Sequence, residues 1–321
     1  VIYAPEPLPA IKDVDAAIRH ALANPIDSDP LKALMFPGMK LTIAFDDISL
    51  PLPKMRRPDI RQRVIEAVLD TAAEVGVDDV HIIAALALHR RMTEDELRHA
   101  LGDRVYDAFA PRGQLYQHDA EDPDGMTSLG QTPHGEDVEI NKRAAESDLL
   151  VYVNINLVAM DGGWKSTATG LSSYRSLRHH HNVNTMRQSR SFMDQHRSEL
   201  HHSNWRMGKV MRDSGPRVFQ IETTINTDTF PSPFEFLSKR EWEWGARERA
   251  TYLATTKALN RTPTKMARKI FHSIEAPHQM TSIQCGEVEA VHKITTENVW
   301  KQQLVEVKGQ TDILTMGIPY I

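Results

Sequence analysis

KLTIAFDD, residues 40–47, decides the fold of this chain: an apolar, β-rich run that ends abruptly in two aspartates. A second apolar run, VHIIAALAL, occupies residues 80–88, and between the two runs apolar residues recur at helical spacing from 58 to 75. A capping box at Thr93 and Glu96 predicts a further helix over 94–101. This order of near-continuous apolar strands and helices predicts an α/β fold with a mostly parallel sheet covered by helices.

Three loops are expected to meet at one edge of this sheet. The run DLLVYVNI, residues 148–155, predicts a third strand. The segments that follow the three strands are DDIS (46–49), HRR (89–91) and, a little further on, GGWK (162–165). Because open α/β sheets bind ligands at the carboxyl ends of their strands, these segments predict a functional site at that edge.

The second half of the chain is expected to extend beyond one domain. RVFQIETTI, residues 217–225, predicts another strand after the Gly215-Pro216 break, and DILTMGIPYI, residues 312–321, predicts a strand that enters a turn. Between them, 231–276 has a helical pattern typical of an inserted lid or an interface. We therefore expect a cofactor-binding domain over 1–215, and a region over 216–321 with this insertion and the start of a C-terminal lobe.

The composition limits the class of protein. A net charge of -5 and a pI of about 6.3 argue against a general nucleic-acid binder, which usually carries a basic domain or stripe. No apolar run approaches the ~20 residues that a membrane-spanning helix needs. Cys285 is the only cysteine, which excludes intrachain disulfides and cysteine-rich zinc sites. We predict a cytoplasmic location and a small-molecule partner.

A lysine that follows a glycine turn is the main chemical signal. In the segment 161–165 (DGGWK), Lys165 follows two glycines, and a run of three histidines ends at His181, sixteen residues later. An amine is a nucleophile, and imidazole nitrogens are metal ligands. The segment therefore predicts a cofactor that is held both covalently and through a metal.

Several sequence blocks resemble the nickel-dependent lactate racemase family, and the chain looks like a divergent member of it. The blocks occur in the family's order across about residues 40–182. The HRxMTxxEL block and the spacing from GGxK to the histidine are the most specific of them. The matching blocks are DDISLPLP (46–53), LHRRMTEDEL (88–97), LGQTPHG (129–135), IN (140–141), GGWK (162–165), TG (169–170) and His181.

This resemblance implies a nickel-pincer nucleotide, which is a pyridinium mononucleotide whose thioamide and thiocarboxylate arms grip nickel. Lys165 would form the thioamide, and His181 would complete the nickel coordination, with His179 and His180 as register alternatives. The cofactor-binding residues implied in this way are Asp46, Asp47, Ser49, Gly162, Gly163 and Lys165.

The resemblance also implies racemisation or epimerisation of a 2-hydroxy acid or sugar acid. A hydride would leave the α-carbon for the cofactor and return to the other face, while His89 of the HRxMT block acts as acid and base. An ordinary histidine pKa of about 6.5 suits that role. The enzymes that synthesise the cofactor would be protein partners.

Two departures from the family pattern affect the substrate. Leu50 replaces the arginine that pairs with the substrate carboxylate, so another arginine would have to bind it. The histidine before the family's glycine turn is also absent, and Asp161 is the expected opposite-face base unless the enzyme acts on one face only. The arginine candidates are Arg90 and Arg91, then Arg56 and Arg57, and the alternative bases are His134 and His118.

Two other classes of function are compatible with the residues alone. The histidine cluster could hold zinc in a hydrolase, which predicts bound zinc and an unmodified Lys165. A non-catalytic homologue that binds a nucleotide is the other class, and it predicts no turnover of any hydroxy acid.

Overall fold

The computed structural model describes residues 2, 5–48 and 54–309. Its centre is a six-stranded sheet with the order β10-β8-β7-β1-β3-β4. Five of these strands are parallel, and β10 runs antiparallel to β8. The strands are β1 (Lys40–Asp46), β3 (Asp79–Ala85), β4 (Leu115–Gln117), β7 (Leu149–Asn156), β8 (Arg217–Ile225) and β10 (Met280–Gly286). The predicted α/β fold with a mostly parallel sheet is confirmed.

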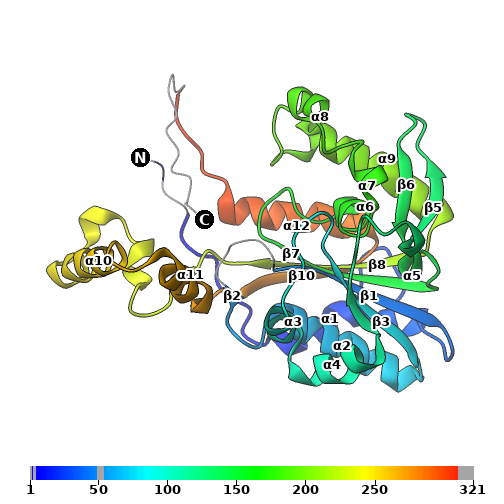
Figure 1. Ribbon diagram of the computed structural model, residues 1–321, viewed down its shortest axis with the longest axis horizontal. Helices are drawn as coiled ribbons and strands as arrows, with labels where there is room; N and C mark the ends of the chain where they lie inside the picture. The colour runs from blue at the N-terminus through cyan, green and yellow to red at the C-terminus, as the bar shows by residue number, and fades with distance from the viewer. Residues whose placement is uncertain (1, 3–4, 49–53, 310–321) are drawn as a thin grey trace.

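Helices cover both faces of the sheet (Figure 1). One face carries α1 (Val14–Ala23), α2 (Ile60–Val75), α3 (Glu94–Leu101) and α4 (Asp103–Phe109). The other carries α6 (Trp164–Gly170) and α12 (Val288–Gln303), with α9 (Glu199–Ser214) packed on α6. Smaller elements complete this side, namely β5 (Met126–Gln131), β6 (Asp137–Asn141), α5 (Lys142–Ala145), α7 (Tyr174–Leu177) and α8 (Val183–Gln188). Short 3₁₀ turns are η1 (Leu31–Leu34), η2 (Ala110–Arg112), η3 (Pro123–Gly125) and η4 (Gln195–Arg197).

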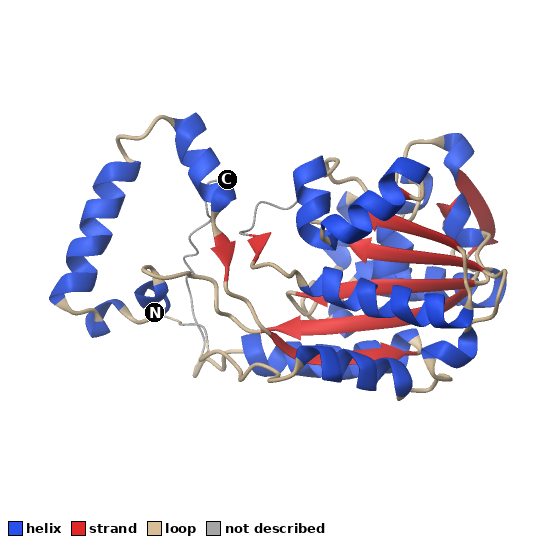
Figure 2. Ribbon diagram, turned by 90° about the horizontal axis from the view of Figure 1, so that it is seen from below, coloured by secondary structure: helices blue, strands red, loops and turns tan. Residues whose placement is uncertain are grey.

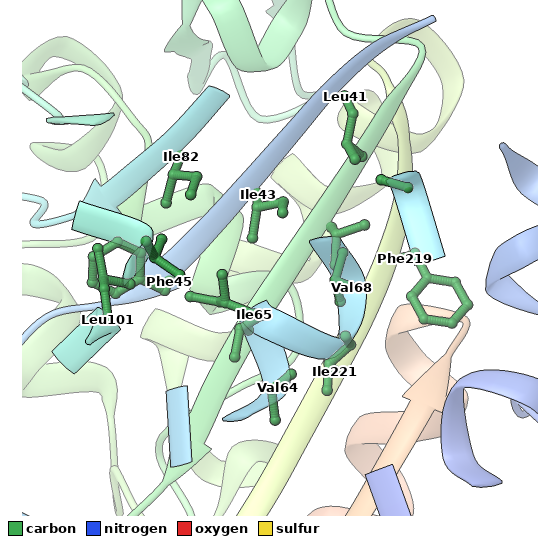
Figure 3. Close-up of a cluster of buried hydrophobic side chains, with 14 of the residues drawn as sticks. Leu41, Ile43, Phe45, Val64, Ile65, Val68, Ile82, Leu101, Phe219 and Ile221 are labelled. Atoms are coloured by element: carbon green, nitrogen blue, oxygen red, sulfur yellow. The ribbon is translucent and has the colours of Figure 1, made fainter. Parts of the chain in front are cut away.

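Strand β1 lies at the centre of the core and is buried on both faces. Alternate residues of a strand point to the same side, so Leu41, Ile43 and Phe45 all face α2. There they pack with Val64, Ile65 and Val68 of that helix (Figure 3). Ala44 faces the other way, into a second buried cluster. This explains why the sequence of β1 is a continuous apolar run rather than an alternating one.

The predicted elements differ from the observed ones in a few places. The strand expected over 80–88 ends at Ala85, and the chain then turns, with Ala87 at φ 51° and its N–H donated to the Gly170 carbonyl. The predicted helix over 94–101 is confirmed, including its capping box. The strand predicted over 312–321 lies outside the described residues. The division at residue 215 stays a prediction, and β8, which follows it, pairs with β7 in the same sheet.

The predicted helical insertion forms an arm that projects beyond the sheet (Figure 2). It consists of two 3₁₀ turns, η5 (Glu235–Ser238) and η6 (Glu241–Glu243), and two helices, α10 (Ala246–Leu259) and α11 (Thr264–Ser273). Trp244 packs between the rings of Phe236 and Tyr252, with centroids 5.2 and 5.1 Å away. The arm returns through β9 (Glu275–Ala276), which pairs with β2 (Lys54–Met55). Across the described ranges, no helix has both the length and the apolar character required to cross a bilayer.

The central position of β1 leads to a stability prediction. Ile43→Ala removes a fully buried side chain and leaves a cavity, and it should lower the free energy of unfolding by about 2–5 kcal/mol. Leu253→Ala in the arm, where the side chain is 67% exposed, should change it by less than about 0.5 kcal/mol. Urea denaturation measures both values, and equal effects would contradict the placement of β1 in the core.

Candidate active site

A cavity of about 420 Å³ lies at the carboxyl ends of β1, β3 and β7. Much of its wall is apolar and comes from the loops after these strands and from the helices above them. The apolar wall includes Leu86, Leu88, Leu157, Met160, Leu177 and Leu200. The candidate site residues on the wall are Asp46, Asp47, His89, Asp161, Gly162, Lys165 and His181. The cavity thus brings together candidate site residues that lie up to 135 positions apart in the sequence, from Asp46 to His181.

Asp46 is the last residue of β1, and its carboxyl group lies in the cavity wall. One oxygen, Oδ2, accepts a hydrogen bond of 3.1 Å from the Ile155 N–H on β7. The other, Oδ1, is buried without a hydrogen-bond partner among the described residues. Burial raises the pKa of Asp46 to about 7. Near neutral pH this carboxyl group is therefore available either to donate or to accept a hydrogen bond.

Asp47 and His89 form a carboxylate–imidazole pair across two loops. The His89 Nδ1 lies 3.2 Å from both carboxylate oxygens of Asp47. This hydrogen bond raises the pKa of His89 above its ordinary value of 6.5. The Asp47 side chain is 7% exposed and the His89 side chain is 44% exposed. Because Nδ1 is engaged, Nε2 is the ring atom available for proton transfer.

A buried ion pair on α2 supports the two aspartates from beneath. Arg61 donates to both carboxylate oxygens of Asp59, at 2.9 and 2.8 Å. Its Nη1 also donates to the backbone carbonyls of Asp46 and Asp47, at 3.2 Å each. Asp59 is the N-cap of α2, so the same pair fixes the start of the helix. The sequence analysis missed this pair, although an Asp-x-Arg at a helix start after Pro58 was visible.

The glycine turn delivers Lys165 to the cavity. Gly162 and Gly163 have φ values of +93° and +60°, which side-chain-bearing residues rarely adopt. The Asp161 carboxylate caps the turn by accepting the N–H groups of Leu157 and Val158, at 3.1 Å each. Its Oδ1 lies 3.5 Å from the Lys165 Nζ. The amine is thus held at the cavity wall by the carboxylate that precedes the glycines.

The side chains of the three consecutive histidines lie in different surroundings. His181 lines the cavity, and its Nδ1 lies 2.9 Å from Nδ1 of the buried His180. His179 instead contacts Asp137, with 3.2 Å between Nε2 and Oδ2. Burial, followed by the nearby Lys165 charge, lowers the pKa of His181. The neutral ring, which is the form that binds metals, is therefore favoured at the cavity.

Several candidate residues do not reach the cavity. Arg90 pairs with Glu96 at 2.7 Å, and Arg91 pairs with Asp119 at 2.6 Å. His118 is buried against the Ser172 carbonyl, and neither it nor His134 lines the wall. Ser49 lies outside the described residues. In the part of the chain that the structure describes, no group of three or more His, Cys, Asp or Glu side chains could hold a metal ion.

Glu222 on β8 and His292 on α12 are buried directly behind the glycine turn, and the sequence analysis missed both. Glu222 is fully buried, and its carboxylate accepts the Gly163 N–H at 2.6 Å. The available signal was a lone acidic residue in the run VFQIETTI, residues 218–225, which is otherwise apolar or neutral. Buried carboxylates are rare unless they are paired, so Glu222 could have been marked as functional or structural before its partners were known.

Solved structures share the fold of this chain. The lactate racemase apoprotein from Thermoanaerobacterium thermosaccharolyticum superposes with a TM-score of 0.61 and 19% identity, over 91% of this chain and 56% of that one. A Thermotoga maritima protein gives a TM-score of 0.56 and 14% identity, over 94% of this chain and 61% of that one. At these identities the likeness establishes the fold alone.

Sequence relatives match about half of the chain. Lactate racemases from Lactiplantibacillus plantarum and T. thermosaccharolyticum are 30% and 27% identical over 168 and 169 residues, which is 51% of this chain in both cases. The matched part spans 37% of each relative's length. The family described as "Lactate racemase N-terminal domain" matches residues 1–194, which is more than half of the chain. The chain therefore belongs to the lactate racemase N-terminal domain family.

Proposed function

We propose that this protein is a racemase or epimerase of a 2-hydroxy acid or sugar acid, with a nickel-pincer nucleotide attached to Lys165. The observation that carries this proposal is a cavity whose wall brings together an amine, an imidazole of a type that can bind a metal, and a carboxylate–imidazole pair. Two relatives of the chain are named lactate racemase, which supports the same class of reaction. Enzymes that synthesise the nucleotide are the proposed partners, and a cytoplasmic location stays a prediction.

The residues of the cavity fit such a cofactor. Lys165 supplies the amine for attachment, and His181 supplies a nitrogen ligand whose neutral form is favoured by burial. Asp46 presents a buried carboxyl oxygen that has no hydrogen-bond partner among the described residues, which suits a polar group of the nucleotide. When bound, the cofactor supplies a soft, electron-accepting centre that takes a hydride from the substrate and returns it.

His89 is the proposed acid and base for the substrate hydroxyl group. Its Nδ1 is held by Asp47, which fixes the tautomer with the Nδ1 proton facing the carboxylate. Nε2 would then accept the hydroxyl proton of one enantiomer, and would return a proton to that oxygen when the same enantiomer is formed in the reverse direction. The same pairing stabilises the protonated ring that forms in between.

Asp161 is the proposed base for the opposite face of the substrate. Its Oδ2 is occupied by two backbone N–H groups, whereas Oδ1 has Lys165 as its contact at 3.5 Å. Attachment of the cofactor converts the lysine amine into a neutral group and so removes that ion pair. Oδ1 is then the oxygen that can take up a proton.

The arginines expected to bind the substrate carboxylate do not line the cavity. Arg90 and Arg91 were the expected partners, but each guanidinium group is paired with an acidic side chain away from the cavity. Either arginine would have to leave its partner to reach the substrate. Arg91 and Asp119 are both exposed, and such surface pairs contribute only about 0–1 kcal/mol, so this exchange costs little. Arg90 donates to both oxygens of the mostly buried Glu96 carboxylate and is held more firmly.

The alternative functions have less support. A zinc hydrolase needs several protein ligands on one metal, and the three histidines face separate surroundings. A non-catalytic nucleotide-binding homologue fits the cofactor pocket, but it gives no role to the Asp47–His89 pair.

An isotope experiment tests the chemical step. With substrate deuterated at the α-carbon, turnover in ordinary water should yield product of inverted configuration that keeps its deuterium. The reason is that the hydride returns to the carbon it left, without exchange with solvent. Nuclear magnetic resonance of the product measures the label. Complete replacement of deuterium by solvent hydrogen would contradict hydride return and favour proton abstraction.

Substitutions separate attachment from catalysis. His89→Ala should lower kcat about 10²–10⁴-fold, the usual contribution of a general acid–base, while the protein keeps its nickel. Lys165→Ala should lose both nickel and turnover. Metal analysis and the rate of racemisation are the two measurements. Full activity of His89→Ala would show that His89 is not the acid and base of the reaction.

The Asp47–His89 pair gives a pH prediction. Asp47 favours the protonated ring, so Asp47→Asn should lower the pKa of His89. Turnover requires the neutral ring, so the acidic limb of the pH–rate profile should move to lower pH. Histidine ring resonances, followed against pH, measure the pKa directly. Asp70→Asn, at an exposed site that pairs with Arg104, is the control and should leave it unchanged. An identical His89 titration in Asp47→Asn would contradict the pairing.

A further inference from the structure

We propose that Glu222 and His292 are positioning residues that hold the Gly162–Gly163 turn and thereby set the direction of Lys165. This proposal rests on the proposed function only in naming Lys165 as the attachment point. Neither residue lies within the stretch 1–194 that matches the family. The turn would then depend on β8 and α12, elements that follow the matched region.

The Glu222 carboxylate contacts several polar groups beneath the turn. Oε1 accepts the Gly163 N–H at 2.6 Å and the Gln220 side-chain amide at 3.1 Å. Oε2 lies 3.2 Å from the His292 Nδ1 and 3.4 Å from the Asn156 amide. Hydrogen bonds to a carboxylate are shorter and stronger than those between neutral groups. The short bond to Gly163 therefore fixes the backbone of the turn firmly.

His292 packs beneath the turn, beside Glu222. Its side chain is 5% exposed and pairs with Glu222 through Nδ1, while Nε2 lies 3.4 Å from the Thr296 hydroxyl. A Cβ atom at Gly163 would come within 2.7 Å of the His292 Cδ2. A Cβ atom at Gly162 would come within 2.5 Å of a Glu222 oxygen. Both glycines thus sit directly on this buried pair.

Two short connections transmit the position of the turn to the lysine. Gly163 is the N-cap of α6, and Lys165 is the second residue of that helix. On the other side, the Asn156 amide that touches Glu222 also donates to the Asp161 carbonyl at 2.7 Å. Asp161 in turn holds the Lys165 amine. Loss of the pair should therefore release the amine from Asp161 and misdirect it within the cavity.

The test measures the reactivity of Lys165 in protein made without the cofactor-synthesis enzymes. The protein is treated with an N-hydroxysuccinimide ester, and the labelling rate of Lys165 is followed by peptide mass spectrometry relative to exposed Lys293. Cys285 is the control for folding, because it is buried on β10 directly opposite Ile221, the neighbour of Glu222. A thiol reagent should find it protected in every variant that is compared.

Two variants disturb the pair from opposite sides. Glu222→Leu removes the acceptor of the Gly163 N–H, and Gly163→Ala pushes the turn away from His292. Each should raise the labelling rate of Lys165 about fivefold, as expected when roughly one hydrogen bond is lost. Glu222→Gln keeps an acceptor oxygen in place and should restore the rate to near that of the parent.

Matched controls separate this effect from general loosening. Gly113→Ala introduces a similar backbone strain, at φ +67°, but meets nothing within 4 Å. Glu297→Gln removes an exposed carboxylate from the same helix as His292. Both should label like the parent. If Glu222→Leu exposes Cys285, the labelling rate of Lys165 in Gly163→Ala decides the test, because this substitution leaves β8 unchanged.

A second measurement links positioning to attachment. When the variants are produced with the cofactor-synthesis enzymes, the fraction of Lys165 that carries added mass should fall in Glu222→Leu and Gly163→Ala, and recover in Glu222→Gln. Unchanged Lys165 labelling in both disturbing variants, with Cys285 protected, would overturn the positioning role. Because labelling needs no cofactor, a failure of the proposed function would leave this result standing.

Discussion

The parallel pairing of β1 with β3 and β7 is the constraint on which the rest of the molecule depends. Asp46 lies opposite Ala85 of β3, and Phe45 lies opposite Val153 of β7, so the three strands end at nearly the same level. Their following loops must therefore start from one edge. Side-chain size fixes this register, because a shift of one residue would turn the large Ile43 and Phe45 toward the cluster in which the small Ala44 packs.

At that edge, different environments give similar groups different chemical roles. Burial raises the pKa of Asp46 to about 7, while its neighbour Asp47 pairs with His89 and raises the pKa of that ring. His181 is also an imidazole, but burial and the Lys165 charge lower its pKa. One histidine is thus suited to exchange protons and the other to bind a metal. Separation of this kind between like groups is typical of catalytic sites.

The sequence was most informative where local pattern and topology act together. Continuous apolar runs predicted β1, β3 and β7, and the parallel arrangement then placed Asp46, His89 and Lys165 at one cavity. Side-chain directions were not predictable, so Arg90 and Arg91 were expected at the site although both pair elsewhere. Glu222 and His292 escaped notice because their partners lie 59 and 70 residues away along the chain.

The central claim is that this cavity carries a covalently attached nickel nucleotide on Lys165. Peptide mass spectrometry combined with metal analysis, on protein produced together with the cofactor-synthesis enzymes, tests it most directly. The account predicts added mass on the peptide that contains Lys165, accompanied by bound nickel. An unmodified Lys165 without nickel under the same conditions would contradict it.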